Sequence, residues 1–137
     1  MLAAAQELVL PLHTDEDVVR LRKQVREHMI AMGFGLIEQT KIITAASELA
    51  RNTLRYGGGG EGRIARVQKG AQQGLEMSFS DEGPGIPDIP QALTDGFTSG
   101  GGLGLGLGGA KRLADDFRID TAPGAGTTVT IVKWKLF

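Results

Sequence analysis

The chain has 137 residues, of which 41% are hydrophobic and 23% are charged, and this predicts one globular domain with a packed core. A net charge of −1 without a basic stripe argues against a nucleic-acid binder, and the absence of cysteine excludes disulfides and thiolate metal sites. Residues 1–12 lack the basic start of a secretory signal, and no segment has the roughly 20 apolar residues that span a bilayer. We therefore expect a cytoplasmic protein with no membrane or nucleic-acid partner.

The N-terminal half contains one predicted strand and two predicted helices. Residues 6–12 have the pattern of a short strand, and Thr14 followed by three acidic residues is typical of a helix start. Apolar residues then recur at helical spacing up to Gly33, a residue type that commonly follows a helix. A second, longer helix is expected over residues 36–56, where four glycines at 57–60 stop it. The apolar residues of the first helix are Val18, Leu21, Val25, Met29 and Met32.

The C-terminal half alternates strands, a long loop and one helix. Two strands joined by a polar turn predict a β-hairpin, and a stretch rich in glycine and proline follows it. Because helices and strands are interleaved, we expect an α/β (α+β) two-layer sandwich, with a mixed, mostly antiparallel sheet covered on one face by three helices. The expected ranges are strands at 62–69 and 74–80, a loop at 81–101 with a short helix at 89–95, a helix at 106–117, and strands at 117–121 and 128–134.

Glu48 and Asn52 lie one turn apart in the second predicted helix. At 100° per residue, their side chains are only about 40° apart on one helix face. A carboxylate and a carboxamide so placed are suited to activating a nucleophile and to binding an oxygen-ligand metal such as Mg²⁺. A solvated helix face is the simpler interpretation of this pair taken alone.

Asp81 follows directly after the second hairpin strand and opens a glycine-rich turn. At the end of a strand, its carboxylate is placed to accept a hydrogen bond from an amino group. Gly83 and Gly85 allow the backbone to approach a flat ring closely. The alternative interpretation is an ordinary turn built from glycine and proline.

The glycine-dense segment at residues 100–109 predicts an anion-binding loop. The chain has 21 glycines, about twice the average usage, and this many in one segment weakens any regular element by roughly 0.5–1 kcal/mol each. The segment leads into a predicted helix N-terminus, where free N–H groups favour phosphate. A P-loop motif is absent, and so are the H-R-D and D-F-G motifs of protein kinases. Gly104, Gly106 and Gly109 satisfy G-x-G-x-x-G, but no acidic residue follows about 20 positions later, which argues against a Rossmann fold.

Four motifs in this order resemble the GHKL superfamily of gyrase, Hsp90, histidine kinases and MutL. The resemblance covers nearly the whole chain and implies the ATP-binding fold of that superfamily. It implies a single ATP-binding domain over residues 1–137, with an ATP lid at about 86–101. The segments are Glu48-x-x-x-Asn52, Asp81-x-Gly83-x-Gly85, Gly102 to Leu107 and Gly126-Thr127, which resemble the N-box, the two glycine boxes and the terminal Gly-Thr pair.

The resemblance also implies a role for each motif. Glu48 would take the proton from the attacking hydroxyl, and Asn52 would bind the Mg²⁺ on the triphosphate. Asp81 would bind the adenine amino group with the help of a water that Thr127 also holds, and the second glycine box would wrap the phosphates. The implied nucleotide-binding residues are Asn52, Asp81, Gly83, Gly85, Ile86, Gly102, Leu103, Gly104, Leu105, Gly106 and Thr127.

Within the superfamily, the chain is most similar to the short branch of serine kinases and anti-sigma factors, and in particular to a switch kinase of bacterial stressosomes. A histidine kinase is not expected, because only one helix precedes the N-box and His28 lacks the usual neighbours. The branch implies an ATP- and Mg²⁺-dependent serine/threonine kinase acting on a STAS-domain antagonist, with a PP2C-type phosphatase as a further partner. Two alternatives remain: an anti-sigma factor that sequesters a sigma subunit, and an ATP-binding regulatory module without kinase activity. The segments that carry this similarity are residues 47–52, 81–89, 95–98, 101–104 and 133–134.

Overall fold

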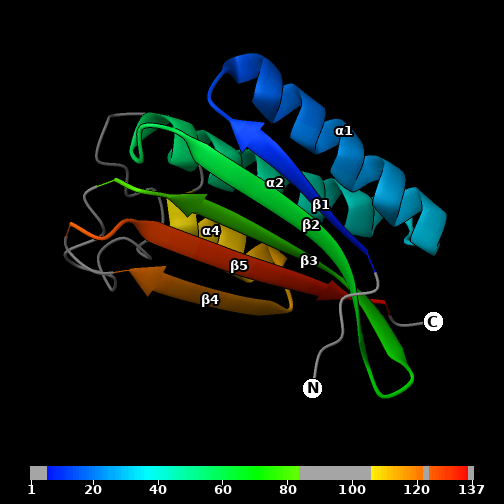
Figure 1. Ribbon diagram of the computed structural model, residues 1–137. Helices are drawn as coiled ribbons and strands as arrows, with labels where there is room; N and C mark the ends of the chain where they lie inside the picture. The colour runs from blue at the N-terminus through cyan, green and yellow to red at the C-terminus, as the bar shows by residue number, and fades with distance from the viewer. Residues whose placement is uncertain (1–5, 84–105, 122–123, 136–137) are drawn as a thin grey trace.

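The computed structural model describes residues 6–83, 106–121 and 124–135. In this part of the chain, three helices cover one face of a five-stranded sheet, which confirms the predicted two-layer sandwich (Figure 1). In chain order the elements are β1 (Gln6–Leu12), α1 (Asp15–Met32), α2 (Leu36–Arg55), β2 (Gly60–Lys69), β3 (Gln72–Asp81), α4 (Gly106–Leu113), β4 (Asp116–Thr121) and β5 (Thr127–Trp134).

The strands follow the order β1-β2-β3-β5-β4 across the sheet. Each of the four neighbouring pairs is antiparallel, so the described sheet shows none of the parallel pairing expected of a mixed sheet. β3 is the central strand, and its last residue, Asp81, lies opposite Gly60 on one side and Thr127 on the other. The end of β3 is therefore enclosed by the first residues of both neighbouring strands.

Helix α1 begins and ends as the sequence predicts. The hydroxyl of Thr14 accepts the N–H of Asp17 at 3.1 Å, and the Asp17 carboxylate accepts the N–H groups of Thr14 at 3.1 Å and His13 at 2.9 Å. The hydrogen bond from His13 contributes most to lowering the pKa of Asp17, against the opposing effect of burial. Gly33, in the left-handed conformation with φ 86°, ends the helix. The five apolar residues Val18, Leu21, Val25, Met29 and Met32 are all buried.

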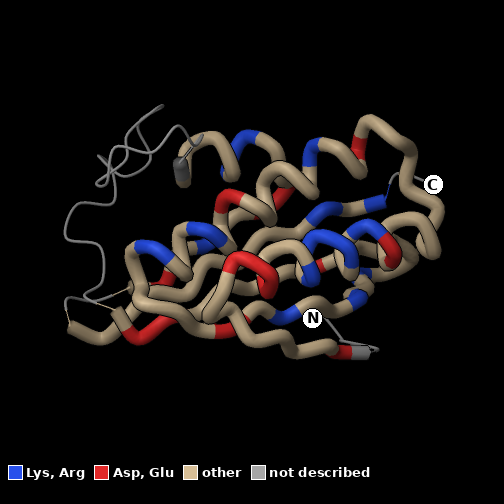
Figure 2. Tube along the Cα trace, turned by 90° about the horizontal axis from the view of Figure 1, so that it is seen from above, with Lys and Arg blue, Asp and Glu red and all other residues tan. Residues whose placement is uncertain are grey.

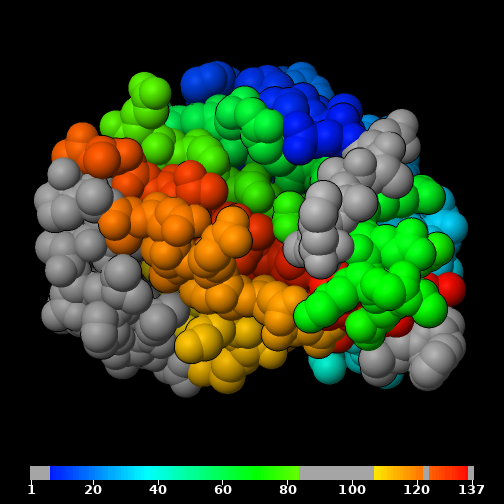
Figure 3. Space-filling view, turned by 60° about the horizontal axis from the view of Figure 1, so that its bottom comes forward, coloured from blue at the N-terminus to red at the C-terminus, as the bar shows by residue number. Residues whose placement is uncertain are grey.

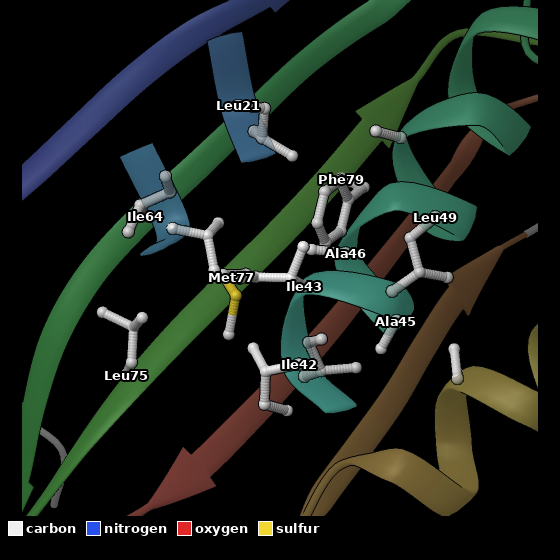
Figure 4. Close-up of a cluster of buried hydrophobic side chains, with 14 of the residues drawn as sticks. Leu21, Ile42, Ile43, Ala45, Ala46, Leu49, Ile64, Leu75, Met77 and Phe79 are labelled. Carbon is white, nitrogen blue, oxygen red and sulfur yellow. The ribbon is translucent and has the colours of Figure 1, made fainter. Parts of the chain in front are cut away.

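The core lies between the helix layer and the sheet (Figure 4). Ile42 and Leu49 of α2 and Met77 and Phe79 of β3 belong to this cluster, and each of these side chains is at most 1% exposed. Burying one side chain of this size contributes about 1.5–3 kcal/mol. This packing fixes α2 against β3 and so determines where the polar side chains of α2 lie relative to the end of that strand.

The opposite face of the sheet carries no helix in the described residues, and β4 and β5 lie at the surface there (Figures 1 and 3). Hydroxyl pairs cross from β3 to β5 on this face, between Ser78 and Thr130 at 3.2 Å and between Ser80 and Thr128 at 3.0 Å. Basic and acidic residues are interspersed along the chain rather than separated (Figure 2). Within the described ranges, none of the helices is long and apolar enough to cross a membrane.

The helix predicted at 106–117 is shorter than expected. It ends at Leu113, and β4 already begins at Asp116. Between them, the Asp115 carboxylate accepts the backbone N–H of Trp134 at 2.8 Å. This bond ties the turn to β5, and the following residues pair with β5 instead of continuing the helix.

Lys133 of β5 connects this turn to α2. Its ammonium group lies 2.8 Å from a Glu38 carboxylate oxygen and 3.1 Å from one of Asp115. Burial lowers the pKa of Lys133, but the hydrogen bonds to Glu38 and Asp115 outweigh it, so the pKa is raised. The charged cluster therefore joins α2, the turn before β4, and β5.

The β2–β3 hairpin is longer at both ends than the predicted strands at 62–69 and 74–80. The pairing reaches Gly60 and Asp81 at the open end, and the turn is correspondingly shorter than predicted. A Cβ at Gly60 would overlap the carbonyl oxygen of Ser80, so pairing this close requires glycine at that position. The short helix predicted at residues 89–95 lies outside the described residues.

Candidate active site

The predicted site residues that the structure describes come together at one end of the sheet. Asp81 ends β3, and Thr127, the first residue of β5, is its cross-strand neighbour. Helix α2 runs to the same end, where the glycine loop 57–60 connects it to β2 (Figure 1). Glu48 and Asn52 lie in the last two turns of α2. One end of the molecule thus combines a strand-terminal carboxylate, a threonine hydroxyl and the polar pair of α2.

The carboxylate of Asp81 is partly buried, and one of its two oxygens has a partner. Oδ1 accepts the backbone N–H of Gly83 at 2.8 Å. Oδ2 has no hydrogen-bond donor among the described residues. The second oxygen is therefore available to accept a hydrogen bond from a ligand.

Glycines approach Asp81 more closely than the sequence suggested. A Cβ at Gly57 would overlap the Asp81 side chain, and a Cβ at Gly126 would overlap the Asp81 carbonyl oxygen. Gly126 also has φ 81°, a conformation that favours glycine. We predicted the glycine run 57–60 only as the end of a helix and missed Gly57 as part of the site. The length of the run could have indicated a second role, because one glycine is enough to end a helix.

Thr127 lies in a chain of hydroxyl hydrogen bonds. Its Oγ1 is 2.9 Å from Oγ1 of Thr121, which in turn donates to the carbonyl oxygen of Gly126 at 3.1 Å. Either hydroxyl can be the donor in the bond between the two threonines. A hydroxyl oxygen has two lone pairs, so in both cases Thr127 retains a lone pair that can accept a hydrogen bond from a water molecule or a ligand.

Glu48 is directed by a neighbour on the same helix. Its Oε1 accepts from Nη1 of Arg51 at 3.1 Å, and the Glu48 side chain is 15% exposed. Arg51 is 43% exposed, so solvent reaches the pair and screens it. The second oxygen of Glu48 has no hydrogen-bond partner within the described residues. The carboxylate is thus oriented and still has a free acceptor.

The residues present are compatible with Mg²⁺ at this site. The side chain of Asn52 is half-buried, and in the described part of the chain its carboxamide makes no hydrogen bond. No group of three or more His, Cys, Asp or Glu that could hold a metal occurs among the described residues. Mg²⁺ at phosphate sites is usually held by one or two protein oxygens together with the phosphates, so a single free carboxamide oxygen fits this kind of binding.

Of the residues predicted in the second glycine box, the structure describes Gly106. It is the first residue of α4, a helix that packs against α2 on the same face of the sheet. Leu107 and Ala110 of α4 are buried in this contact layer. The predicted residues Gly85, Ile86, Gly102, Leu103, Gly104 and Leu105 lie outside the described residues, as does the predicted lid at 86–101.

Residues 37–136 match the family of histidine kinase-, DNA gyrase B-, and HSP90-like ATPases. The matched span begins in α2 and extends beyond β5, so it contains every described site residue. The chain belongs to this family. The resemblance to the GHKL superfamily is thereby confirmed.

Similar proteins within the GHKL family include kinases and anti-sigma factors. The serine/threonine-protein kinase RsbT of Bacillus subtilis (strain 168) is 44% identical over 121 residues, which cover 88% of this chain and 91% of RsbT. An anti-sigma F factor of Bacillus licheniformis is 32% identical over 101 residues, 70% of this chain and 69% of the factor.

A solved structure supports the fold. The crystal structure of the RsbU and RsbW domains of a Mycobacterium tuberculosis protein matches 96% of this chain with a TM-score of 0.61 and 21% sequence identity. This chain spans 33% of that longer protein. At this identity, the likeness shows a shared GHKL fold and nothing finer.

Proposed function

We propose that this chain is a serine/threonine protein kinase that transfers the γ-phosphate of ATP to a STAS-domain antagonist in a bacterial partner-switching pathway. The observation that carries the proposal is the meeting of Asp81, Thr127 and the Glu48/Asn52 pair at one end of the sheet. The 44% identity to the kinase RsbT, over nearly the full length of both chains, supports the same activity. We place the protein in the cytoplasm, where such partners and ATP are found together.

In the proposed complex, Asp81 recognises the adenine base. Its free Oδ2 accepts a hydrogen bond from the 6-amino group, while Oδ1 stays bonded to Gly83. A hydrogen bond to a charged group contributes about 1.5–3 kcal/mol. Thr127 holds a water beside the base with its free lone pair. Gly83 of the first glycine box lets the backbone approach the base closely, and the second glycine box, whose Gly106 begins α4, brings backbone N–H groups to the phosphates.

Asn52 would hold Mg²⁺ through its carboxamide oxygen. A bound Mg²⁺ would supply positive charge beside the phosphates during transfer of the γ-phosphoryl group. The half-buried position of Asn52 on a packed helix holds this oxygen in one place. Loss of the carboxamide is therefore expected to weaken metal-dependent ATP binding more than binding of the nucleotide alone.

Glu48 accepts the proton of the attacking hydroxyl. As the substrate oxygen forms its bond to the γ-phosphorus and the bond to the β-phosphate oxygen breaks, this proton passes to the free oxygen of Glu48 and ADP leaves. Arg51 keeps the carboxylate oriented through its 3.1 Å contact. Assistance of this type is typically worth about 10²–10⁴-fold in rate.

The anti-sigma role is the second candidate function, because anti-sigma F factors are 32% identical to this chain over 70% of its length. Capture of partners by the purified protein separates the two roles: a sigma subunit favours sequestration, whereas a STAS protein or a PP2C-type phosphatase favours the switch kinase.

The kinase proposal is tested by incubating the protein with labelled Mg-ATP and a purified STAS-domain protein. Label on a serine or threonine of that protein is the expected result. If ATP binds but neither a STAS protein nor the chain itself becomes labelled, the protein is a nucleotide-binding regulatory module without kinase activity, and the kinase proposal is wrong.

A further inference from the structure

Gly57 lies directly against the side chain of Asp81. A Cβ built on Gly57 would overlap Cβ and Cγ of Asp81 and would lie 2.5 Å from Oδ2. Gly57 also approaches Gly83, where a Cβ would lie 2.8 Å from the Cα of Gly57. The backbone of Gly57 thus lies against both the carboxylate and the residue that hydrogen-bonds to it.

Neither side of this contact moves easily. Asp81 ends the central strand and is paired with Gly60 and Thr127, so its Cβ stays in place whichever way the carboxylate turns. Gly57 is tied to the last turn of α2, because its N–H donates to the carbonyl oxygen of Asn52 at 3.3 Å. Because a turn of the carboxylate cannot relieve an overlap with Cβ, a side chain at residue 57 would force the backbone of residue 57 and the Asp81 side chain apart.

We propose that Gly57 is a positioning residue for nucleotide selection, which sets the orientation of the Asp81 carboxylate toward the 6-amino group of adenine. This inference rests on the proposed ATP site. Gly57 contacts the base-binding carboxylate directly and is hydrogen-bonded to the backbone of Asn52.

The test compares ATP with purine riboside triphosphate, which lacks the 6-amino group. Dissociation constants are measured by calorimetry for the wild type, Gly57→Ala, Asp81→Asn and the double variant. Gly57→Ala is expected to weaken ATP binding roughly tenfold and to leave binding of the analogue nearly unchanged. Because Gly57 acts through Asp81, the double variant should be no weaker for ATP than Asp81→Asn alone.

Gly58→Asn is the matched control in the same loop. Gly58 has φ 75° and open space around a Cβ, and asparagine tolerates this conformation. Its affinity for both nucleotides should equal that of the wild type. If Gly57→Ala fails to fold, Asp81→Gly is added to it. Recovery of folding is expected, because the overlap is with the Asp81 side chain, and failure to recover would overturn the assignment.

The outcomes separate this inference from the proposed site. Three results would overturn the role of Gly57 while the ATP site stands. Gly57→Ala could weaken the binding of both nucleotides equally, or it could leave the affinity for ATP unchanged. The losses of ATP affinity in the double variant could also be additive. If the wild type binds no ATP, or if Asp81→Asn leaves selection against the analogue unchanged, the base-binding role of Asp81 fails and the inference fails with it.

Discussion

Replacement of Asp81 by asparagine tests the nucleotide site most directly, because it changes the hydrogen-bonding groups with almost no change in volume. The carboxylate offers two acceptors, of which Oδ1 takes the N–H of Gly83 at 2.8 Å and Oδ2 is proposed to take the adenine amino group. A carboxamide offers one acceptor and one donor group. In either orientation, the Asn nitrogen would face another N–H group, so either Gly83 or the base loses its acceptor.

Without nucleotide, the Asp81→Asn side chain can keep its hydrogen bond to Gly83. In the complex with ATP, it loses either this bond or the bond to the base. The loss therefore lowers the affinity for ATP in both orientations of the carboxamide. Loss of a charge-assisted hydrogen bond of about 1.5–3 kcal/mol corresponds to a roughly 10- to 150-fold higher Kd. Calorimetric titration with ATP and magnesium measures this change. Asp120→Asn makes the same chemical change at an exposed position of β4 and should leave the Kd unchanged. An Asp81→Asn affinity within about twofold of the wild type would refute the base-binding role.

Three further predictions concern catalysis, pH and the core. Glu48→Gln should slow phosphotransfer by about 10²–10⁴-fold in single-turnover experiments while the Kd for ATP is retained, and full activity would remove Glu48 from the proton-accepting role. The pKa of Asp17 is lowered in the folded protein, so its carboxylate stabilises the fold at pH values above the unfolded pKa of about 3.8. This contribution to stability is lost as the pH falls through the pKa of Asp17 in the folded protein. The urea midpoints of the wild type and Asp17→Asn should therefore differ at neutral pH, and this difference should shrink as the pH falls below about 3.8 and vanish below the folded pKa of Asp17. A difference that stays constant over this range would contradict this account. Leu49→Ala should cost about 2–5 kcal/mol in denaturant unfolding, whereas Ile37→Ala, at a position 70% exposed, should stay within about 0.5 kcal/mol; equal losses would contradict the assigned core.

Helix α2 links recognition and catalysis in the proposed mechanism. It carries the proton acceptor Glu48 and the metal ligand Asn52, and its C-terminal end places Gly57 against the base-binding Asp81. The core contacts of α2 with β3 therefore support all three functions at once. Changes that loosen this packing are expected to affect nucleotide affinity as well as stability.

The local patterns of the sequence were sufficient for most element types. Thr14 with its acidic neighbours predicted the start of α1, and the structure has the corresponding capping box. Element ends were less accurate, because they depend on distant partners. The helix predicted to reach residue 117 ends at Leu113, where Asp115 hydrogen-bonds to Trp134 of a strand that comes later in the chain.

By itself, the sequence determined the class of the fold and the order of the four motifs, and it predicted which residue types bind a nucleotide. Helical spacing, turn chemistry and glycine density are all local properties of the chain. Only the tertiary structure decided which of these residues meet. Asp81 and Thr127 become neighbours through the pairing of β3 with β5, and Gly57 reaches Asp81 because α2 packs on the sheet. Such contacts depend on the order of the strands in the sheet and on how closely two backbones approach. Neither of these can be read from residues that are close together in the sequence.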